Sequence, residues 1–207
     1  MDKKVLLLDV DEVICFSSFL PLVNEFLDTN YQIDDCSNYY IDEEFIPKDK
    51  MDEFNKFIST RNLYENATIL PGAIEVIKLL NEYYDIYPLT SCINPFDIQN
   101  SGILFLNKYK FLLKNLPFID PRKYIFTESK DKVKGDIIID DRLSNLRSNI
   151  RLKILFPSYH NKNISDEELT KNHVIRAGYD WRNGWLKTKE ILMDYYYKKK
   201  LLNYKWL

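Results

Sequence analysis

Two short apolar runs that end in pairs of aspartates constrain the fold of this chain more than any other feature. The run Val5–Leu8 is followed by Asp9 and Asp11, and the run in "GDIIIDD" ends at Asp140 and Asp141. Continuous apolar runs of this length are typical of parallel strands that are buried on both faces of a sheet. Other short apolar runs follow, separated by segments with helical periodicity. The alternation predicts an α/β fold, a Rossmann-like parallel sheet with helices on both faces.

The other predicted elements continue this pattern along the chain. Pro88 lies inside one predicted strand, and because proline lacks a backbone donor we expect a local bulge there. Residues 29–68 are polar, acidic and aromatic, and they predict helical pieces without a clear strand. We expect strands at 5–8, 85–91, 123–127, 135–141, 153–158 and 173–178, and helices at 18–28, 70–83, 96–115, from 165 onward, and at 183–200.

The composition of the chain bounds its class. Its 207 residues, of which 45% are hydrophobic, suit one domain or one domain with an inserted subdomain. The formal net charge of −2 and the lack of a basic stripe argue against a nucleic acid polymer or an anionic membrane as partner. Three cysteines without metal-like spacing favour a reducing compartment, and no run approaches the ~20 apolar residues of a membrane span. We therefore expect a soluble, cytoplasmic protein.

The aspartates at the strand ends predict a cation site. The carboxyl ends of parallel strands meet at one edge of the sheet, where ligands bind, and residues i and i+2 of an extended chain project to the same side. Asp9 and Asp11 can therefore face the point that Asp140 and Asp141 approach from another strand. Each carboxylate pair at ~4 Å costs about 4 kcal/mol, so the aspartates either bind protons or surround a cation. Oxygen ligands without His or Cys nearby suit Mg²⁺, which in turn suits phosphate chemistry.

Four motifs, taken in order, resemble those of a known superfamily. They are "DVDEV", "PLTS", a downstream lysine and "IIIDDR", and they are similar to the four motifs of the haloacid dehalogenase superfamily of phosphotransferases. The stretches "LPGAIEVIKLL", "TSCINP", "FTESKDKVKGDIIIDDR", "ILFPSYHNK" and "YDWRNGWLKTKEIL" further resemble the 5'(3')-deoxyribonucleotidases in order and spacing. The resemblance covers residues 3–16 and about 69–192. It implies a catalytic core of residues 1–16 and 69–207, with a small helical cap, residues 17–68, inserted after the first strand.

The resemblance also implies roles for the aspartates. Asp9 would be the nucleophile that attacks phosphorus and forms an aspartyl-phosphate. Asp11 would protonate the leaving oxygen and then take a proton from the attacking water. Asp9, the backbone carbonyl of Asp11 and Asp141 would hold Mg²⁺, with Asp140 in support. The sequence leaves open which aspartate of this last pair is the direct ligand.

The phosphate-binding groups follow from the same resemblance. Thr90 and Ser91 would hold phosphate oxygens, and a lysine would neutralise the charge that builds on those oxygens. Lys130, Lys132 and Lys134 are all candidates, and the family spacing to the aspartate pair selects Lys130.

The part of the site that would bind the base departs from the family pattern. Glu12 stands where the family usually has glycine, and we expect its side chain to point away, with altered activity or substrate choice as the alternative. His160 is expected to be structural, because the implied mechanism needs no histidine. Each aromatic of the expected cap could equally pack inside the cap. The candidates for contact with the base are Phe16, Ser17, Tyr39, Tyr40, Phe45 and Tyr64.

Three functions remain open at this point. The first is a Mg²⁺-dependent phosphatase that hydrolyses (deoxy)ribonucleoside monophosphates to nucleoside and phosphate. The second keeps that mechanism for another small phosphomonoester, such as a sugar phosphate. The third is a non-catalytic module that binds a nucleotide or a metal. The resemblance also implies a homodimer as one expectation, since members of that family are often dimers.

Overall fold

A parallel sheet forms the centre of the computed structural model, which describes residues 2–94 and 98–204, with side chains up to residue 198. Among these residues, six strands form the sheet in the order β5-β4-β1-β6-β7-β8, and every pair of neighbours is parallel. The predicted α/β fold with a parallel sheet is therefore confirmed. The strands are β1 (Lys4–Leu8), β4 (Tyr84–Thr90), β5 (Ile125–Phe126), β6 (Ile137–Asp140), β7 (Leu152–Leu155) and β8 (Val174–Arg176).

Helices cover both faces of this sheet. Seven α-helices are described: α1 (Phe19–Leu27), α2 (Ile41–Phe45), α3 (Met51–Ser59), α4 (Ala73–Leu80), α5 (Gly102–Asn115), α6 (Asp166–Lys171) and α7 (Gly184–Tyr204). Short 3-10 turns lie at Ile33–Asp35, Lys48–Lys50, Ile98–Asn100, Pro121–Lys123, Lys130–Lys132 and Trp181–Asn183. The helix expected at 96–115 thus appears as a short turn and α5, and its residues 96–97 lie outside the described residues.

The alternation of side chains along the strands divides the core into two layers. Leu6 and Leu8 of β1 belong to a cluster that also contains residues of α4, α5 and α7. Leu7, between them, belongs to a second cluster with residues of α6 and of the turn after β6. Because β6 and the last three residues of β1 are buried on both sides, the centre of the sheet is covered on both faces, as the continuous apolar runs predict.

Pro88 does not interrupt its strand. The pairing of β4 with β1 runs without a break from Tyr84 to Pro88, so the expected bulge is wrong. The other neighbour of β4, β5, pairs with it only at Leu89 and Thr90. Pro88 therefore has a ladder partner on one side only, and its missing N–H disturbs one strand pair at most.

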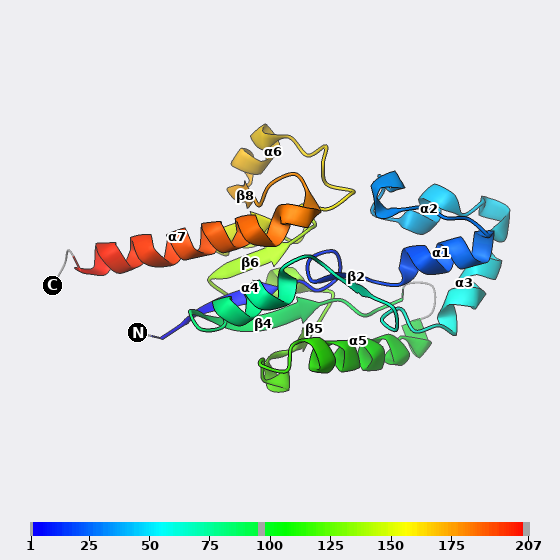
Figure 1. Cartoon of the computed structure of the whole chain (residues 1–207), viewed down its shortest axis with the longest axis horizontal. Helices are drawn as coiled ribbons and strands as arrows, with labels where there is room; N and C mark the ends of the chain where they lie inside the picture. Colours follow the sequence, from blue (N-terminus) through cyan, green and yellow to red (C-terminus); the bar gives the residue numbers. More distant parts are fainter. Residues whose placement is uncertain (1, 95–97, 205–207) are drawn as a thin grey trace.

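The carboxyl ends of the strands face a group of helices formed by residues 17–68, here called the helical segment. In Figure 1, β1 runs toward α1, α2 and α3, which lie beyond the right-hand end of the sheet. Two short strands, β2 (Cys15–Phe16) and β3 (Thr68–Ile69), form an antiparallel pair where the chain enters and leaves the helical segment. The sequence did not predict this pair. The helical segment therefore lies over the edge where the aspartates emerge.

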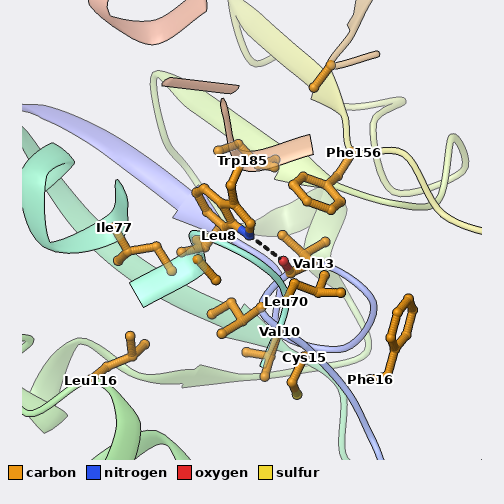
Figure 2. Packing of buried hydrophobic residues seen from close by; sticks show 14 of the residues in the cluster. Leu8, Val10, Val13, Cys15, Phe16, Leu70, Ile77, Leu116, Phe156 and Trp185 are labelled. Atoms are coloured by element: carbon orange, nitrogen blue, oxygen red, sulfur yellow. Dashed lines mark hydrogen bonds between the residues drawn. The ribbon is translucent and has the colours of Figure 1, made fainter. Parts of the chain in front are cut away.

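Trp185 of α7 anchors the loop after β1. The indole Nε1 of Trp185 donates a hydrogen bond to the carbonyl of Val13 at 2.7 Å, and its ring packs against Phe156 (Figure 2). Val10 and Val13 are completely buried. The backbone between them is thus fixed by packing, and it carries Asp11 and Glu12 into the site.

Within residues 2–94 and 98–204, no helix combines the length and the apolar character needed to cross a membrane.

Candidate active site

Asp9 and Lys130 form a buried ion pair at the end of β1. Asp9 is 7% exposed and Lys130 6% exposed, and the Lys130 Nζ lies 2.6 Å from Asp9 Oδ2. The backbone N–H of Val10 donates to the other oxygen, Asp9 Oδ1, at 2.7 Å. Burial, together with the charge of Asp140, raises the pKa of Asp9 to about 7, while Lys130 opposes this shift. A positive charge beside Asp9 is therefore needed to stabilise its ionised form.

Asp140 supports Lys130 rather than facing the cavity. Lys130 Nζ donates to Asp140 Oδ2 at 2.9 Å. Asn145 Nδ2 donates to both oxygens of Asp140, at 2.9 and 3.1 Å, and the backbone N–H of Arg142 donates to Oδ1 at 2.9 Å. Both carboxylate oxygens of Asp140 are thus occupied by protein donors.

Asp141 contacts a histidine and lies close to a glutamate. His160 Nε2 lies 2.6 Å from Asp141 Oδ2 and 3.8 Å from Glu12 Oε2. The Tyr159 hydroxyl donates to Glu12 Oε1 at 3.1 Å. Burial and then the charge of Asp141 raise the pKa of Glu12 well above its usual value, and burial likewise raises the pKa of Asp141, against the hydrogen bond from His160.

The expectation that Glu12 points away is therefore wrong. Its backbone has φ 57, a left-handed conformation that favours glycine, and its side chain reaches into the cluster with Asp141 and His160. His160, which was expected to be structural, lies in the site and contacts a predicted metal ligand, Asp141. Sequence reasoning missed this contact because the two residues come from loops after different strands, β6 and β7.

Asp11 has two partners that come from outside the four motifs. Its Oδ1 accepts a hydrogen bond from the Tyr64 hydroxyl at 2.7 Å, and its Oδ2 lies 2.6 Å from Lys108 Nζ. Lys108 Nζ also donates to Thr90 Oγ1 at 2.8 Å and to the carbonyl of Ser91. Burial disfavours the charge of Lys108, but the carboxylate of Asp11 and the other negative groups around it together raise the pKa of Lys108.

Lys108 is the site residue that sequence reasoning missed. It projects from α5 on the same face as Phe111 and Leu112, and all three are buried. A lysine in register with the apolar face of a helix is the signal that could have revealed it, since lysine is rarely buried without a partner. Of the three lysines considered from the sequence, the structure places only Lys130 in the site. Lys132 pairs with Asp131 at the surface.

The charges of this site do not balance. Among the described residues, five carboxylates meet two ammonium groups there, so the two lysines leave about three negative charges uncompensated when all five carboxylates are ionised. Oxygen atoms of three of these residues, Asp9, Asp140 and Asp141, lie within 4.8 Å of one another. Such a donor set fits a hard cation. The five carboxylates are Asp9, Asp11, Glu12, Asp140 and Asp141, and the ammonium groups are Lys108 and Lys130.

A cavity of about 320 Å³ lies between this cluster and the helical segment. Asp11, Ser91 and Lys108 line it on the side of the sheet, and the Ser91 hydroxyl donates to Glu128. Phe45 does not reach the cavity, because its ring stacks on Tyr31 at 4.1 Å between centroids. The other candidates for contact with a base all line it: Phe16, Ser17, Tyr39, Tyr40 and Tyr64.

The chain belongs to a class of phosphoric monoester hydrolases, the 5'-nucleotidases. Residues 3–175 match the model of a protein family described as "5' nucleotidase, deoxy (Pyrimidine), cytosolic type C protein", and the chain belongs to this family. The resemblance to the 5'(3')-deoxyribonucleotidases is thereby confirmed.

Two relatives in sequence agree with the family assignment. A Staphylococcus epidermidis protein is 30% identical over 168 residues, which cover 79% of this chain and 88% of that protein. The 5'(3')-deoxyribonucleotidase of Bacillus subtilis is 27% identical over 172 residues, 78% of this chain and 89% of its own. A haloacid dehalogenase-like hydrolase of Streptococcus pneumoniae aligns in structure over 85% of this chain and 94% of its own, with a TM-score of 0.48 and 14% identity.

Proposed function

We propose that this protein is a Mg²⁺-dependent phosphatase that hydrolyses (deoxy)ribonucleoside monophosphates to nucleoside and phosphate. One observation carries the proposal above all: a buried carboxylate, Asp9, lies beside Lys130 and two residues before Asp11, which lines the cavity, in a chain of the deoxyribonucleotidase family. The Bacillus subtilis relative bears the name of such an enzyme.

Asp9 is the nucleophile in this proposal. Its carboxylate oxygen attacks phosphorus, a P–O bond to Asp9 forms, and the P–O bond to the nucleoside breaks. The electron pair of the broken bond goes to the leaving oxygen, which takes a proton from Asp11. In the second step Asp11 removes a proton from water as the water attacks the aspartyl-phosphate, and phosphate and free Asp9 result. Packing of the loop after β1 keeps both carboxylates in place during these steps.

Mg²⁺ fits the donor set at the carboxyl ends of β1 and β6. Asp9, the backbone carbonyl of Asp11 and Asp141 would hold it. Asp140 would not be a direct ligand in this proposal, because Lys130, Asn145 and a backbone N–H already donate to its oxygens. When bound, the cation screens the charge of the nucleophile from the anionic phosphate and stabilises the transferring group.

Four groups bind the phosphate oxygens in this proposal. Thr90 and Ser91 offer a hydroxyl and a backbone amide, and Lys130 offers an ammonium group beside Asp9. Lys108 is added to these because its ammonium group already bridges Asp11 and Thr90. Two buried cations, one beside Asp9 and one beside Asp11, are suited to a dianion, and they compensate charge as it develops in the transition state.

The helical segment, residues 17–68, acts as a cap in this proposal, and residues 1–16 and 69–207 form the catalytic core. The cavity of about 320 Å³ between them is lined by aromatic rings from both parts, Phe16, Tyr39, Tyr40 and Tyr64. Concave sites with aromatic walls and a few polar groups suit a flat apolar ring with a polar end. A nucleoside monophosphate has this form.

The test is release of inorganic phosphate from a panel of esters. The panel contains ribo- and deoxyribonucleoside 5'- and 3'-monophosphates and several sugar phosphates, each with Mg²⁺ and with chelator. We expect release from deoxyribonucleotides that needs Mg²⁺ and is abolished in Asp9→Asn. Release from sugar phosphates alone would move the substrate, and binding of Mg²⁺ by a folded protein without any release would favour a non-catalytic module.

A further inference from the structure

We infer that Tyr64 is a positioning residue that holds the side chain of Asp11 in place for proton transfer to the leaving group. The inference rests on the proposed function, because it assumes that Asp11 is the general acid. Tyr64 contacts Asp11 through its hydroxyl and not through its ring: the distance between Tyr64 Oη and Asp11 Oδ1 is 2.7 Å. An aromatic residue that merely lined the cavity would need no hydroxyl at this place.

The two oxygens of Asp11 have different partners. Oδ1 accepts from the Tyr64 hydroxyl, and Oδ2 accepts from Lys108 Nζ at 2.6 Å. The carboxyl group of Asp11 is therefore held at both oxygens, and Tyr64 is the partner that comes from the helical segment.

The surroundings of Tyr64 make it a rigid donor. Its ring packs against Phe111 of α5 with centroids 5.4 Å apart, and its backbone N–H donates to Asn62 Oδ1 at 3.0 Å. The residue before it, Leu63, accepts a hydrogen bond from the backbone N–H of Ser18 at 2.7 Å, which ties the end of the helical segment to its beginning. The hydroxyl thus reaches Asp11 from a fixed point, as positioning of a catalytic group requires.

The experiment compares two small phosphate esters whose leaving groups differ in basicity, p-nitrophenyl phosphate and methyl phosphate. Nitrophenolate leaves without a proton, whereas methoxide needs one, so only the second ester depends strongly on the general acid. We expect Tyr64→Phe, which keeps the ring, to lower kcat for methyl phosphate about tenfold to a hundredfold relative to kcat for nitrophenyl phosphate. Tyr87→Phe, a tyrosine on β4, is the matched control and should leave the ratio of the two rates unchanged.

The outcomes separate this inference from the proposed function. Equal losses on both esters in Tyr64→Phe, or no loss on either, would overturn the positioning role. Hydrolysis of both esters by the wild-type protein without hydrolysis of any nucleotide would refute the proposed substrate and would still test Tyr64. A wild-type protein that hydrolyses neither ester overturns both proposals. A crystal structure of Tyr64→Phe should show the Asp11 carboxylate turned away from its present position, and an unmoved carboxylate would contradict the inference.

Discussion

Replacing Lys108 with methionine should separate catalysis from stability in this protein. Methionine has a similar length and remains compatible with a buried helix face, but it removes the ammonium group. In the wild-type protein that group lies 2.6 Å from Asp11 Oδ2 and 2.8 Å from Thr90 Oγ1. The substitution therefore removes one charge from the proposed phosphate site and leaves the fold of α5 intact.

The size of both effects follows from these contacts. A hydrogen bond to a charged group contributes about 1.5–3 kcal/mol, which corresponds to a loss of roughly 10- to 150-fold in kcat/KM when the bond is made in the transition state. The loss of folding stability should be smaller, within about 1 kcal/mol, because the buried ammonium no longer has to be desolvated. Asp11 is not left isolated, since its side chain is 34% exposed and keeps the bond from Tyr64.

The assay is phosphate release at saturating Mg²⁺, combined with chemical denaturation of the same samples. Lys110→Met is the matched control, because Lys110 lies on the same helix but is exposed. A Lys108→Met variant whose kcat/KM stays within about threefold of the wild-type value would refute the assignment of Lys108 to the phosphate site. A loss of activity that merely follows a loss of folded protein would refute it as well.

Two further substitutions test the buried charges. Lys130→Met should lower the free energy of unfolding in chelator by about 3–5 kcal/mol, because Asp9 and Asp140 lose the ammonium group that they share. The control is Lys132→Met, at an exposed lysine. A loss below about 1 kcal/mol in Lys130→Met, no larger than in the control, would contradict the prediction. In chelator, Glu12→Gln should become more stable relative to the wild type as the pH rises above about 4.5. The pKa of Glu12 is higher in the folded protein than in the unfolded chain, so the wild-type protein loses folding stability over this range and the glutamine variant does not. Parallel stability curves for the two proteins between acidic and neutral pH would show that Glu12 does not titrate differently on folding.

The strands of this fold could be predicted because their signal is local. Val5–Leu8 and the run before Asp140 are apolar on both sides, and this pattern is specific to strands inside a parallel sheet. The pairing of β2 with β3 could not be predicted, because each strand has only two residues and the two lie far apart in the chain. Pro88 misled the prediction because β5 is too short to pair with it, and the length of a neighbouring strand cannot be read from the sequence around Pro88.

The site shows the same division between local and distant signals. The structure brings Asp9, Lys130 and Asp141 together, and all three follow from motifs whose spacing is written in the chain. Lys108 belongs to no motif, and it reaches the site only because α5 packs with its buried face toward the sheet. Phe45 illustrates the opposite error, since composition alone cannot show that its ring is already occupied by Tyr31.

The two carboxylates at the centre of the site are held by different parts of the molecule. Asp9 is fixed by Lys130, which Asp140 supports from the neighbouring strand β6, so its surroundings belong to the sheet. Asp11 is fixed by Tyr64 and Lys108, which come from the end of the helical segment and from α5. A movement of the helical segment would therefore displace the partner of Asp11 without disturbing that of Asp9. Under the proposed mechanism, protonation of the leaving group depends on how that segment sits, whereas the attack on phosphorus depends on the sheet. Substitutions inside the segment should accordingly change the response to the leaving group more than the binding of Mg²⁺.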